Sequence, residues 1–107
     1  GVASEVRHIC ELSDVGALIY ADKIPISKEM INDAKKINKN PLDFALYGGE
    51  DFELIFTANK NKIKQFKKYD VKVIGKVVDK RFWIKLIKNG KKYNLESGFD
   101  HFNRLRV

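Results

Sequence analysis

The sequence predicts an α+β fold in which helices pack on a mainly antiparallel sheet. Helical periodicity dominates the first half of the 107-residue chain, and alternating apolar residues dominate the second half. An Asn89-Gly90 pair between two strand-like runs is a strong hairpin signal, because both residue types tolerate a positive φ. Helices followed by hairpin-connected strands are typical of helices packed on one antiparallel sheet. The length suits a single domain with one core, residues 1–107.

The first twenty residues predict a helix followed by a strand. Apolar residues recur on one helical face until a polar turn, with Gly16 as the stop signal; these residues are Val2, Val6, Ile9 and Cys10. The natural N-cap is expected before residue 1, so the sequence resembles a piece of a longer chain. Branched and aromatic residues in the range 17–20 then predict a short strand.

Two more helices are expected before residue 48. Pro25 favours an extended link, and Ser27 is a suitable N-cap for a helix whose apolar stripe is Met30, Ile31, Ala34 and Ile37. A polar loop at 38–40 ends that helix. Pro41 suits the first position of another short helix.

The second half predicts mostly strands. Apolar residues alternate over 52–56, over 71–78 with a possible bulge at Gly75, and over 82–86, and a return strand is expected at 93–95. Asn59 could cap a lysine-rich helix between the first two of these strands, with Ile63 and Phe66 facing inward.

Composition limits the classes of function. No apolar run approaches the length of a membrane span, and no signal peptide is visible. The single cysteine, Cys10, fits a reducing cytoplasm. The net charge is +7, but only four of the 21 basic residues are arginines and the lysines are dispersed. This pattern indicates a solvated surface more than specific nucleic-acid binding.

No catalytic or metal constellation is evident from residue types and spacing. His8 and Cys10 lie two residues apart on a helix and point in different directions, and the chain has too few such residues for a zinc site. There is no convincing Ser-His-Asp set, no phosphate-binding P-loop and no G-x-G-x-x-G. By itself, the chain does not resemble a complete enzyme.

The stretch Ala45-Leu46-Tyr47-Gly48-Gly49-Glu50-Asp51-Phe52-Glu53-Leu54-Ile55-Phe56-Thr57 is the most informative part of the sequence. It predicts a helix, a sharp glycine turn where φ > 0 is available, two acids at the corner and then a strand. The plainer interpretation is a helix C-cap glycine followed by an edge strand. Asp51 and Glu53, on the same side of such a strand, suit salt bridges with lysines.

The C-terminal aromatic residues also leave two interpretations open. Phe99 and Phe102 follow Gly98 and could close the core against the sheet, or a partly exposed ring could stack on a flat ligand.

Three segments resemble the thiamine-monophosphate kinase family. ALYGGEDFELIFT at 45–57 is similar to the matching segment of that family, and GVASEVRHIC at 1–10 is similar to the helix that follows its Asp-x-Ser-Asp-Gly motif, with Gly1 as the last residue. The C-terminal run at 98–102 matches an aromatic motif of the family. The segments occur in the family's order. Aminoimidazole ribonucleotide synthetase and selenophosphate synthetase share the superfamily but are less similar in these motifs.

The resemblance implies the C-terminal, substrate-side α+β domain of a kinase whose N-terminal ATP-binding domain is absent from this chain. The family transfers the γ-phosphoryl group of ATP to thiamine monophosphate with Mg²⁺, giving thiamine diphosphate, and the full-length protein is expected to be a cytoplasmic homodimer. Metal-binding and catalytic acids are expected outside residues 1–107, so the chain alone is expected to be inactive.

Two substrate-binding residues carry over from the family. Glu50 matches the glutamate of its Gly-Glu-Asp segment, and Phe99 matches its C-terminal aromatic residue. A carboxylate suits the amine or the cationic ring of thiamine, and an aromatic face attracts a flat cation. The alternatives are another ATP-dependent enzyme of the superfamily and a non-catalytic basic module that binds polyanions.

Overall fold

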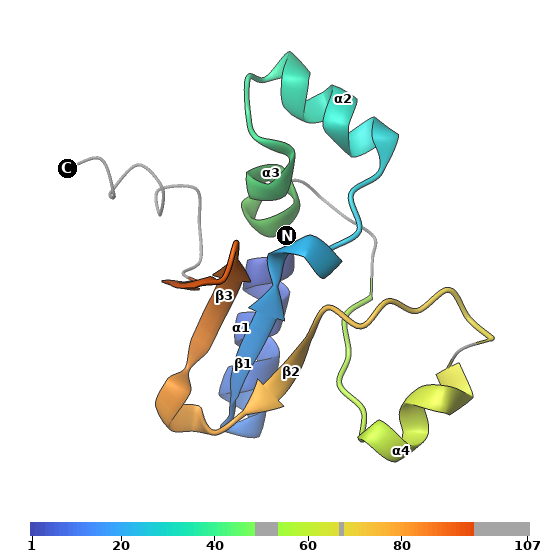
Figure 1. Ribbon diagram of the computed structural model, residues 1–107, viewed down its shortest axis with the longest axis vertical. Helices are drawn as coiled ribbons and strands as arrows, with labels where there is room; N and C mark the ends of the chain where they lie inside the picture. The colour runs from blue at the N-terminus through green and yellow to red at the C-terminus, as the bar shows by residue number, and fades with distance from the viewer. Residues whose placement is uncertain (49–53, 67, 96–107) are drawn as a thin grey trace.

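The computed structural model describes residues 1–48, 54–66 and 68–95, and Figure 1 shows their arrangement. Its α-helices are α1 (Val2–Ser13), α2 (Lys28–Lys36), α3 (Pro41–Tyr47) and α4 (Lys60–Ile63). Its strands are β1 (Gly16–Tyr20), β2 (Gly75–Val78), β3 (Ile84–Lys88) and β4 (Lys91–Asn94). Short 3₁₀ turns lie at Ala21–Lys23, Lys64–Phe66 and Lys80–Phe82.

The four strands form one mixed sheet in the order β2-β1-β3-β4. β1 pairs with β2 and β3 pairs with β4 in antiparallel fashion, whereas the central β1–β3 pair is parallel, with Ala17 beside Ile84. The expected α+β class with a mainly antiparallel sheet is therefore confirmed. The parallel pair was not expected from the sequence, but the long connection between β1 and β3 leaves room for such a crossover.

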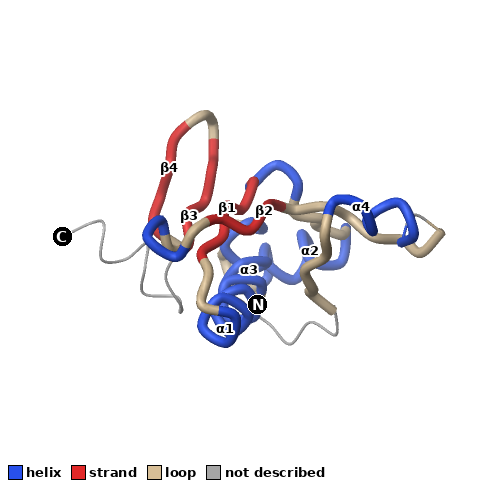
Figure 2. The backbone as a smooth tube through the Cα atoms, turned by 90° about the horizontal axis from the view of Figure 1, so that it is seen from below, coloured by secondary structure: helices blue, strands red, loops and turns tan. Residues whose placement is uncertain are grey.

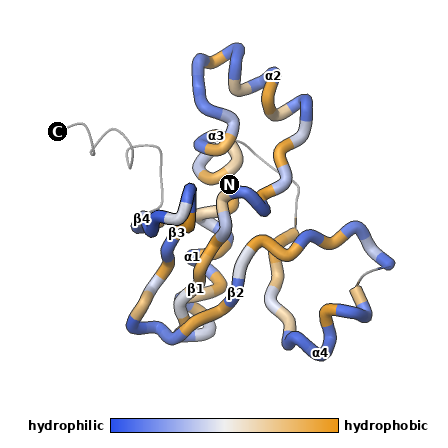
Figure 3. Tube along the Cα trace, viewed as in Figure 1, coloured by the Kyte–Doolittle hydropathy of each residue, from blue (hydrophilic) through white to orange (hydrophobic). Residues whose placement is uncertain are grey.

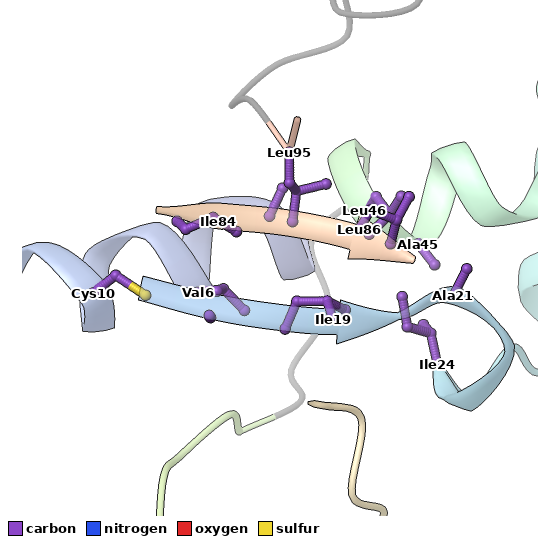
Figure 4. Packing of buried hydrophobic residues seen from close by; sticks show 12 residues of the cluster. Val6, Cys10, Ile19, Ala21, Ile24, Ala45, Leu46, Ile84, Leu86 and Leu95 are labelled. Carbon is purple, nitrogen blue, oxygen red and sulfur yellow. The ribbon is translucent and has the colours of Figure 1, made fainter. Parts of the chain in front are cut away.

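Helices α1 and α3 lie on the same side of the sheet, as Figure 2 shows. The core lies between these helices and the sheet. It combines buried side chains from α1, β1, β3 and α3, including Val6, Cys10, Ile19, Ile84 and Leu46 (Figure 4). Leu46 is fully buried, and Leu95 joins the same cluster just after β4. Figure 3 shows the corresponding hydrophobic run along β1, in contrast to the mostly hydrophilic α4.

Local signals account for several elements. The Ser27 hydroxyl oxygen accepts the Met30 N–H at 3.1 Å and caps α2, as expected. Pro41 opens α3, and the Asn40 side chain accepts the Leu42 N–H at 2.8 Å. Asn89 and Gly90 have φ values of 52° and 75°, so the β3–β4 hairpin has the turn that its sequence predicts.

Several boundaries differ from the sequence predictions. Gly1 occupies the N-cap of α1. The helix ends near Ser13 and Asp14 as expected, with Asp14 left-handed (φ 56°), but Gly16 begins β1 and is not the residue that stops the helix. Asn59 occupies the N-cap of α4 but makes no side-chain capping hydrogen bond.

The first two strands predicted for the second half are missing or shortened in the described residues, whereas β3 and β4 form close to their predicted ranges. β2 covers only the second half of the expected strand 71–78, and residues 54–56 are not in a strand; residues 52 and 53 lie outside the described part. Phe56 contacts Phe66, with ring centroids 5.1 Å apart, and Ile55 packs against the main core, so side-chain contacts hold residues 54–56 without strand pairing. Gly75 pairs directly with Ile19 and forms no bulge. No helix in the described ranges is both long and apolar enough to span a membrane.

Candidate functional site

The amino end of α1 meets the carboxyl end of α3, and this meeting point immediately precedes the predicted substrate corner. The N-terminus lies beside α3 in the views of both Figure 1 and Figure 2. The contact is so close that a Cβ on Gly1 would lie 2.4 Å from the Leu46 carbonyl oxygen and 3.0 Å from the Tyr47 backbone nitrogen. Opposite partial charges of the two helix ends meet here, which favours the approach.

Helix α3 is held firmly at this end. Ala45 and Leu46 are buried in the core, and the Gly48 N–H donates to the Phe44 carbonyl oxygen at 2.9 Å. Gly48 has φ −106° and ψ 166°, which is extended backbone open to any residue. The positive φ that glycine makes available is therefore not used at Gly48, because the chain leaves α3 in an extended direction. Gly49 lies outside the described residues.

The two predicted substrate-binding residues, Glu50 and Phe99, lie outside the described residues, as do Asp51 and Glu53. The structure describes the residues that lead to them. Glu50 follows Gly48 by two residues, and Phe99 follows Leu95 by four. Leu95 is anchored, since it is 4% exposed and its N–H donates to the Ile84 carbonyl oxygen at 3.2 Å. The positions of the Glu50 and Phe99 side chains stay predictions.

Metal-ligating residue types do not cluster in the described part of the chain. Within those ranges, no group of three or more His, Cys, Asp or Glu side chains could hold a metal ion. His8 is exposed on α1. Cys10, which the sequence places on the apolar face of this helix, is buried in the core, and burial raises the pKa of its thiol. Cys10 is therefore not a reactive thiolate.

A groove of about 540 Å³ lies at the other end of α1. Its walls include Ile9 of α1, Val77 of β2, and Asn59, Lys62 and Phe66 from the α4 region. Because Gly1 and Leu46 do not line it, this groove is separate from the corner that leads to Glu50.

Charged side chains near the carboxyl end of α1 have a structural role. Lys80 Nζ lies 2.7 Å from Asp14 Oδ1, and this hydrogen bond, with the charge of Asp14, raises the pKa of Lys80. Both side chains are largely exposed, so the pair links the end of α1 to the turn before β3 without forming a buried charged site.

Sequence reasoning did not identify the Gly1–Leu46 contact. The residues are 45 positions apart, and no periodic pattern relates them. The only local signal is glycine at an N-cap position, where Ser, Thr, Asp or Asn would supply a side-chain hydrogen bond. The glycine is explained by the backbone that lies against it.

Comparison with known proteins identifies relatives over nearly the whole chain, although no family model matches it. Thiamine-monophosphate kinase of Buchnera aphidicola subsp. Schizaphis graminum is 40% identical over 109 residues, covering 95% of this chain and 33% of the relative. The Haemophilus influenzae kinase of the same name is 35% identical over 112 residues, with 95% and 34% covered. The Aquifex aeolicus kinase is 36% identical over 77 residues, with 72% and 24% covered.

The fold is similar as well. A solved structure of AaThiL complexed with AMPPCP and TMP has a TM-score of 0.68 and 33% sequence identity, covering 95% of this chain and 31% of that one. The chain thus spans about a quarter to a third of the length of the proteins it matches. By sequence and by fold, this chain belongs to the thiamine-monophosphate kinase family.

Proposed function

We propose that this chain is the substrate-side part of a kinase that transfers the γ-phosphoryl group of ATP to thiamine monophosphate, giving thiamine diphosphate. The carrying observation is the match to named thiamine-monophosphate kinases over 95% of the chain, at up to 40% identity. The similar solved structure is complexed with AMPPCP, an ATP analogue, and with TMP. Both kinds of ligand fit a phosphoryl transfer between two bound substrates.

The proposal divides the work between two domains. Residues 1–107 form one C-terminal domain, and the remaining part of the full-length protein binds ATP and the Mg²⁺ ions that neutralise phosphate charge. By the same family likeness, we propose that the full-length protein is a cytoplasmic homodimer.

The isolated chain should be unable to catalyse the transfer. With the proposed ATP- and metal-binding part missing, the reacting groups cannot be aligned or their charge neutralised. Purified residues 1–107, incubated with ATP, Mg²⁺ and thiamine monophosphate, should form no thiamine diphosphate above background. Sustained turnover that depends on both ATP and Mg²⁺ would contradict the proposed division.

Glu50 and Phe99 are the proposed substrate-binding residues. Thiamine carries a cationic thiazolium ring and an aminopyrimidine, so a carboxylate can balance the charge or accept hydrogen bonds from the amine. An aromatic ring can stack on the flat cation. Glu50 follows the buried Leu46 by four residues in the sequence, so the proposed substrate residue comes soon after an anchored helix end. A fixed helix end reduces the conformational freedom lost when a neighbouring side chain binds its ligand.

The role of Glu50 is tested in the full-length enzyme with Glu50→Gln. The change removes the charge and keeps the size, so the KM for thiamine monophosphate should rise by roughly tenfold, the loss expected of one charge-assisted interaction worth about 1.5 kcal/mol. The KM for ATP should change less than twofold. Glu53→Gln, an identical charge change three residues away, is the matched control and should leave both constants unchanged. Equal effects of the two variants would contradict a specific role for Glu50.

Phe99 is tested by Phe99→Ala and Phe99→Tyr. Stacking on a cation is worth about 0.5–2 kcal/mol, so the alanine variant should raise the KM for thiamine monophosphate by roughly 2- to 30-fold. The tyrosine variant keeps an aromatic face and should restore most of the affinity. A panel of substrates of related ATP-dependent enzymes, run on the unaltered protein, separates this kinase from other members of the superfamily.

A further inference from the structure

We propose that the outer face of the sheet, on the side away from α1 and α3, binds single-stranded nucleic acid without base specificity. In the described part of the chain, the four strands contain lysines but no aspartate or glutamate. The strand register places three of these lysines on the outer face, among apolar and aromatic side chains. The inference goes beyond the proposed kinase function and does not depend on it.

The alternation of side chains along the strands defines the outer face. Ile19 of β1 and Leu86 of β3 are buried in the core with residues of α1 and α3, so the residues next to them in each strand point to the opposite side of the sheet. Figure 2 shows no described α-helix on that side. By strand register, the outer face consists of Leu18, Tyr20, Lys76, Lys85, Ile87 and Lys92.

Strand pairing arranges these side chains in rows across the sheet. Leu18 pairs with Lys76 on one side and with Lys85 on the other. In the next row, Ile87 lies between Tyr20 and Lys92. Because Lys76 and Lys92 lie on the two outermost strands, the positive charges extend over three strand spacings, about 14 Å. Lysines that surround an aromatic ring suit the phosphates and the bases of one nucleic acid strand.

The three lysines are available to bind phosphate. Lys76 and Lys92 are exposed, and within the described ranges neither they nor Lys85 form an ion pair. Lys85 Nζ donates a hydrogen bond to Asn94 Oδ1, an uncharged partner that leaves the positive charge of the lysine uncompensated. Clustered positive charges without carboxylate partners attract polyanions and release the counterions of the phosphates.

The turn before β3 adds exposed aromatic rings beside the outer face. Gly16 precedes Leu18 by two residues and therefore faces the same side, and a Cβ there would lie 2.4 Å from the Trp83 carbonyl oxygen. This turn thus borders the outer face. Phe82 and Trp83 are 50% and 38% exposed, and the Arg81 guanidinium lies 4.8 Å from the centroid of the Phe82 ring. Exposed rings with a cation beside them can stack on bases.

A single strand fits this face better than the surface of an anionic membrane. Membrane-surface binding uses apolar side chains that enter the lipid by about 5–10 Å, whereas Leu18 and Ile87 are half-buried among the lysines of a sheet. A flat sheet instead offers rings on which unpaired bases can stack, whatever their sequence. Lysine in place of arginine suits contacts to phosphate without recognition of bases.

Binding is measured with the full-length protein and a fluorescein-labelled oligouridine of about 12 nucleotides, by fluorescence anisotropy. The Kd should be about 1–100 µM. Three phosphate contacts predict a slope of about −2 for the logarithm of affinity against the logarithm of salt concentration, which is a loss of about 20-fold between about 50 and 200 mM salt. No binding at about 50 mM salt would overturn the inference and leave the proposed kinase function standing.

Replacement of the three outer-face lysines by glutamine locates the binding site. The triple variant Lys76→Gln, Lys85→Gln and Lys92→Gln should bind oligouridine at least about tenfold more weakly at about 50 mM salt. It should also lose most of the salt dependence, because each phosphate contact contributes about −0.7 to the slope. An unchanged slope in this variant would place the phosphate contacts elsewhere and contradict the proposal.

Three lysines of α2 provide the matched control. Lys28, Lys35 and Lys36 are exposed, and their replacement by glutamine removes the same charge from a surface outside the sheet. This variant should keep its affinity for oligouridine within about threefold, because salt screens charges away from the binding site. Equal weakening by the two triple variants would indicate a general attraction to the net charge of +7 and would overturn the inference.

The stacking contribution is tested at Tyr20. Tyr20→Ala should weaken binding of oligouridine by roughly 5- to 150-fold, whereas Tyr20→Phe keeps the ring and should bind within about twofold of the unaltered protein. Neither change should alter the salt slope, because no phosphate contact is lost. Equal losses in the two variants would rule out stacking on this ring.

Two further outcomes identify a different occupant of the outer face. Vesicles of equal parts phosphatidylserine and phosphatidylcholine test the membrane: binding to vesicles through the three lysines, with no binding to oligouridine, would assign the face to lipid and overturn the inference. A lower Tm of the triple outer-face variant in a full-length protein that does not bind oligouridine would show that the rest of the protein covers the face. The inference would then fail while the proposed kinase function stands.

Discussion

Replacement of Leu46 by alanine tests whether α3 is anchored as the structure indicates. Leu46 is fully buried among side chains from α1, β1 and β3. Leu→Ala removes three carbon atoms, worth roughly 2.4 kcal/mol of transfer free energy, and the cavity left behind adds about 1 kcal/mol. The free energy of unfolding should therefore fall by about 3–4 kcal/mol, a large share of the ~5–15 kcal/mol typical of a domain.

Urea unfolding of the chain, followed by circular dichroism, measures this loss. Leu12→Ala is the matched control, since Leu12 is 88% exposed on α1 and its truncation should change stability by no more than about 0.5 kcal/mol. In a thermal scan, Leu46→Ala should lower the Tm by roughly 12–25 °C. A loss below about 1 kcal/mol for Leu46→Ala, or equal losses for both variants, would mean that α3 does not dock in the core and would remove the support for a fixed corner.

Further predictions concern local features at three residues. Cys10 should react with a thiol reagent at pH 8 at least about tenfold more slowly in the folded chain than in urea, because burial raises the pKa of its thiol. Because the pKa of the thiol is raised in the folded chain, the unfolded chain loses the Cys10 proton at a lower pH. The contribution of Cys10 to the free energy of unfolding should therefore decline as the pH rises above the ordinary thiol value. Urea titrations of Cys10→Ala and of the unaltered chain at alkaline pH measure this decline. Ser27→Ala should cost about 1 kcal/mol in urea unfolding, and Ser27→Asp should retain the cap. Gly90→Ala should cost about 1–2 kcal/mol through its φ of 75° alone, because nothing lies within 4 Å of the added Cβ.

The sequence predicts those elements whose causes are local. Ser27, Pro41 and the Asn89-Gly90 pair each act within a few residues, and the structure has a helix or a turn at each of them. The class of fold follows from these elements and from the alternating pattern of β3. Local chemistry is sufficient here because caps, prolines and turn glycines act on the backbone next to them.

Pairing between distant segments is not predictable in this way. The parallel β1–β3 pair and the short β2 depend on which strands meet in space. Residues 54–56 have an alternating pattern but no strand, because Phe56 packs on Phe66 and leaves this segment without a pairing partner in the described sheet. An alternating apolar pattern shows that a segment could form a strand, and the rest of the fold decides whether a neighbouring strand is available to pair with it.

The candidate site also combines residues found from the sequence with contacts that only the structure reveals. Glu50 and Phe99 are found by resemblance to a family, since a single carboxylate or ring has no spacing that identifies a substrate. The Gly1 contact becomes visible only when α1 and α3 are placed together, because its partner is 45 residues away. Resemblance therefore names the residues proposed to touch the ligand, and the structure adds contacts between distant parts of the described chain.

The two ends of α1 make different contacts. The Gly1 end contacts the segment that leads to Glu50, whereas the other end carries the ion pair between Asp14 and Lys80 and precedes the close contact of Gly16 with Trp83. Variants of both ends can lower the Tm, because both ends pack against the same core. In the full-length enzyme, Asp14→Asn should leave both KM values within about twofold, as expected for an exposed ion pair with a structural role. A selective rise in the KM for thiamine monophosphate on Asp14→Asn would show that this ion pair acts on substrate binding, and its purely structural role would then be wrong.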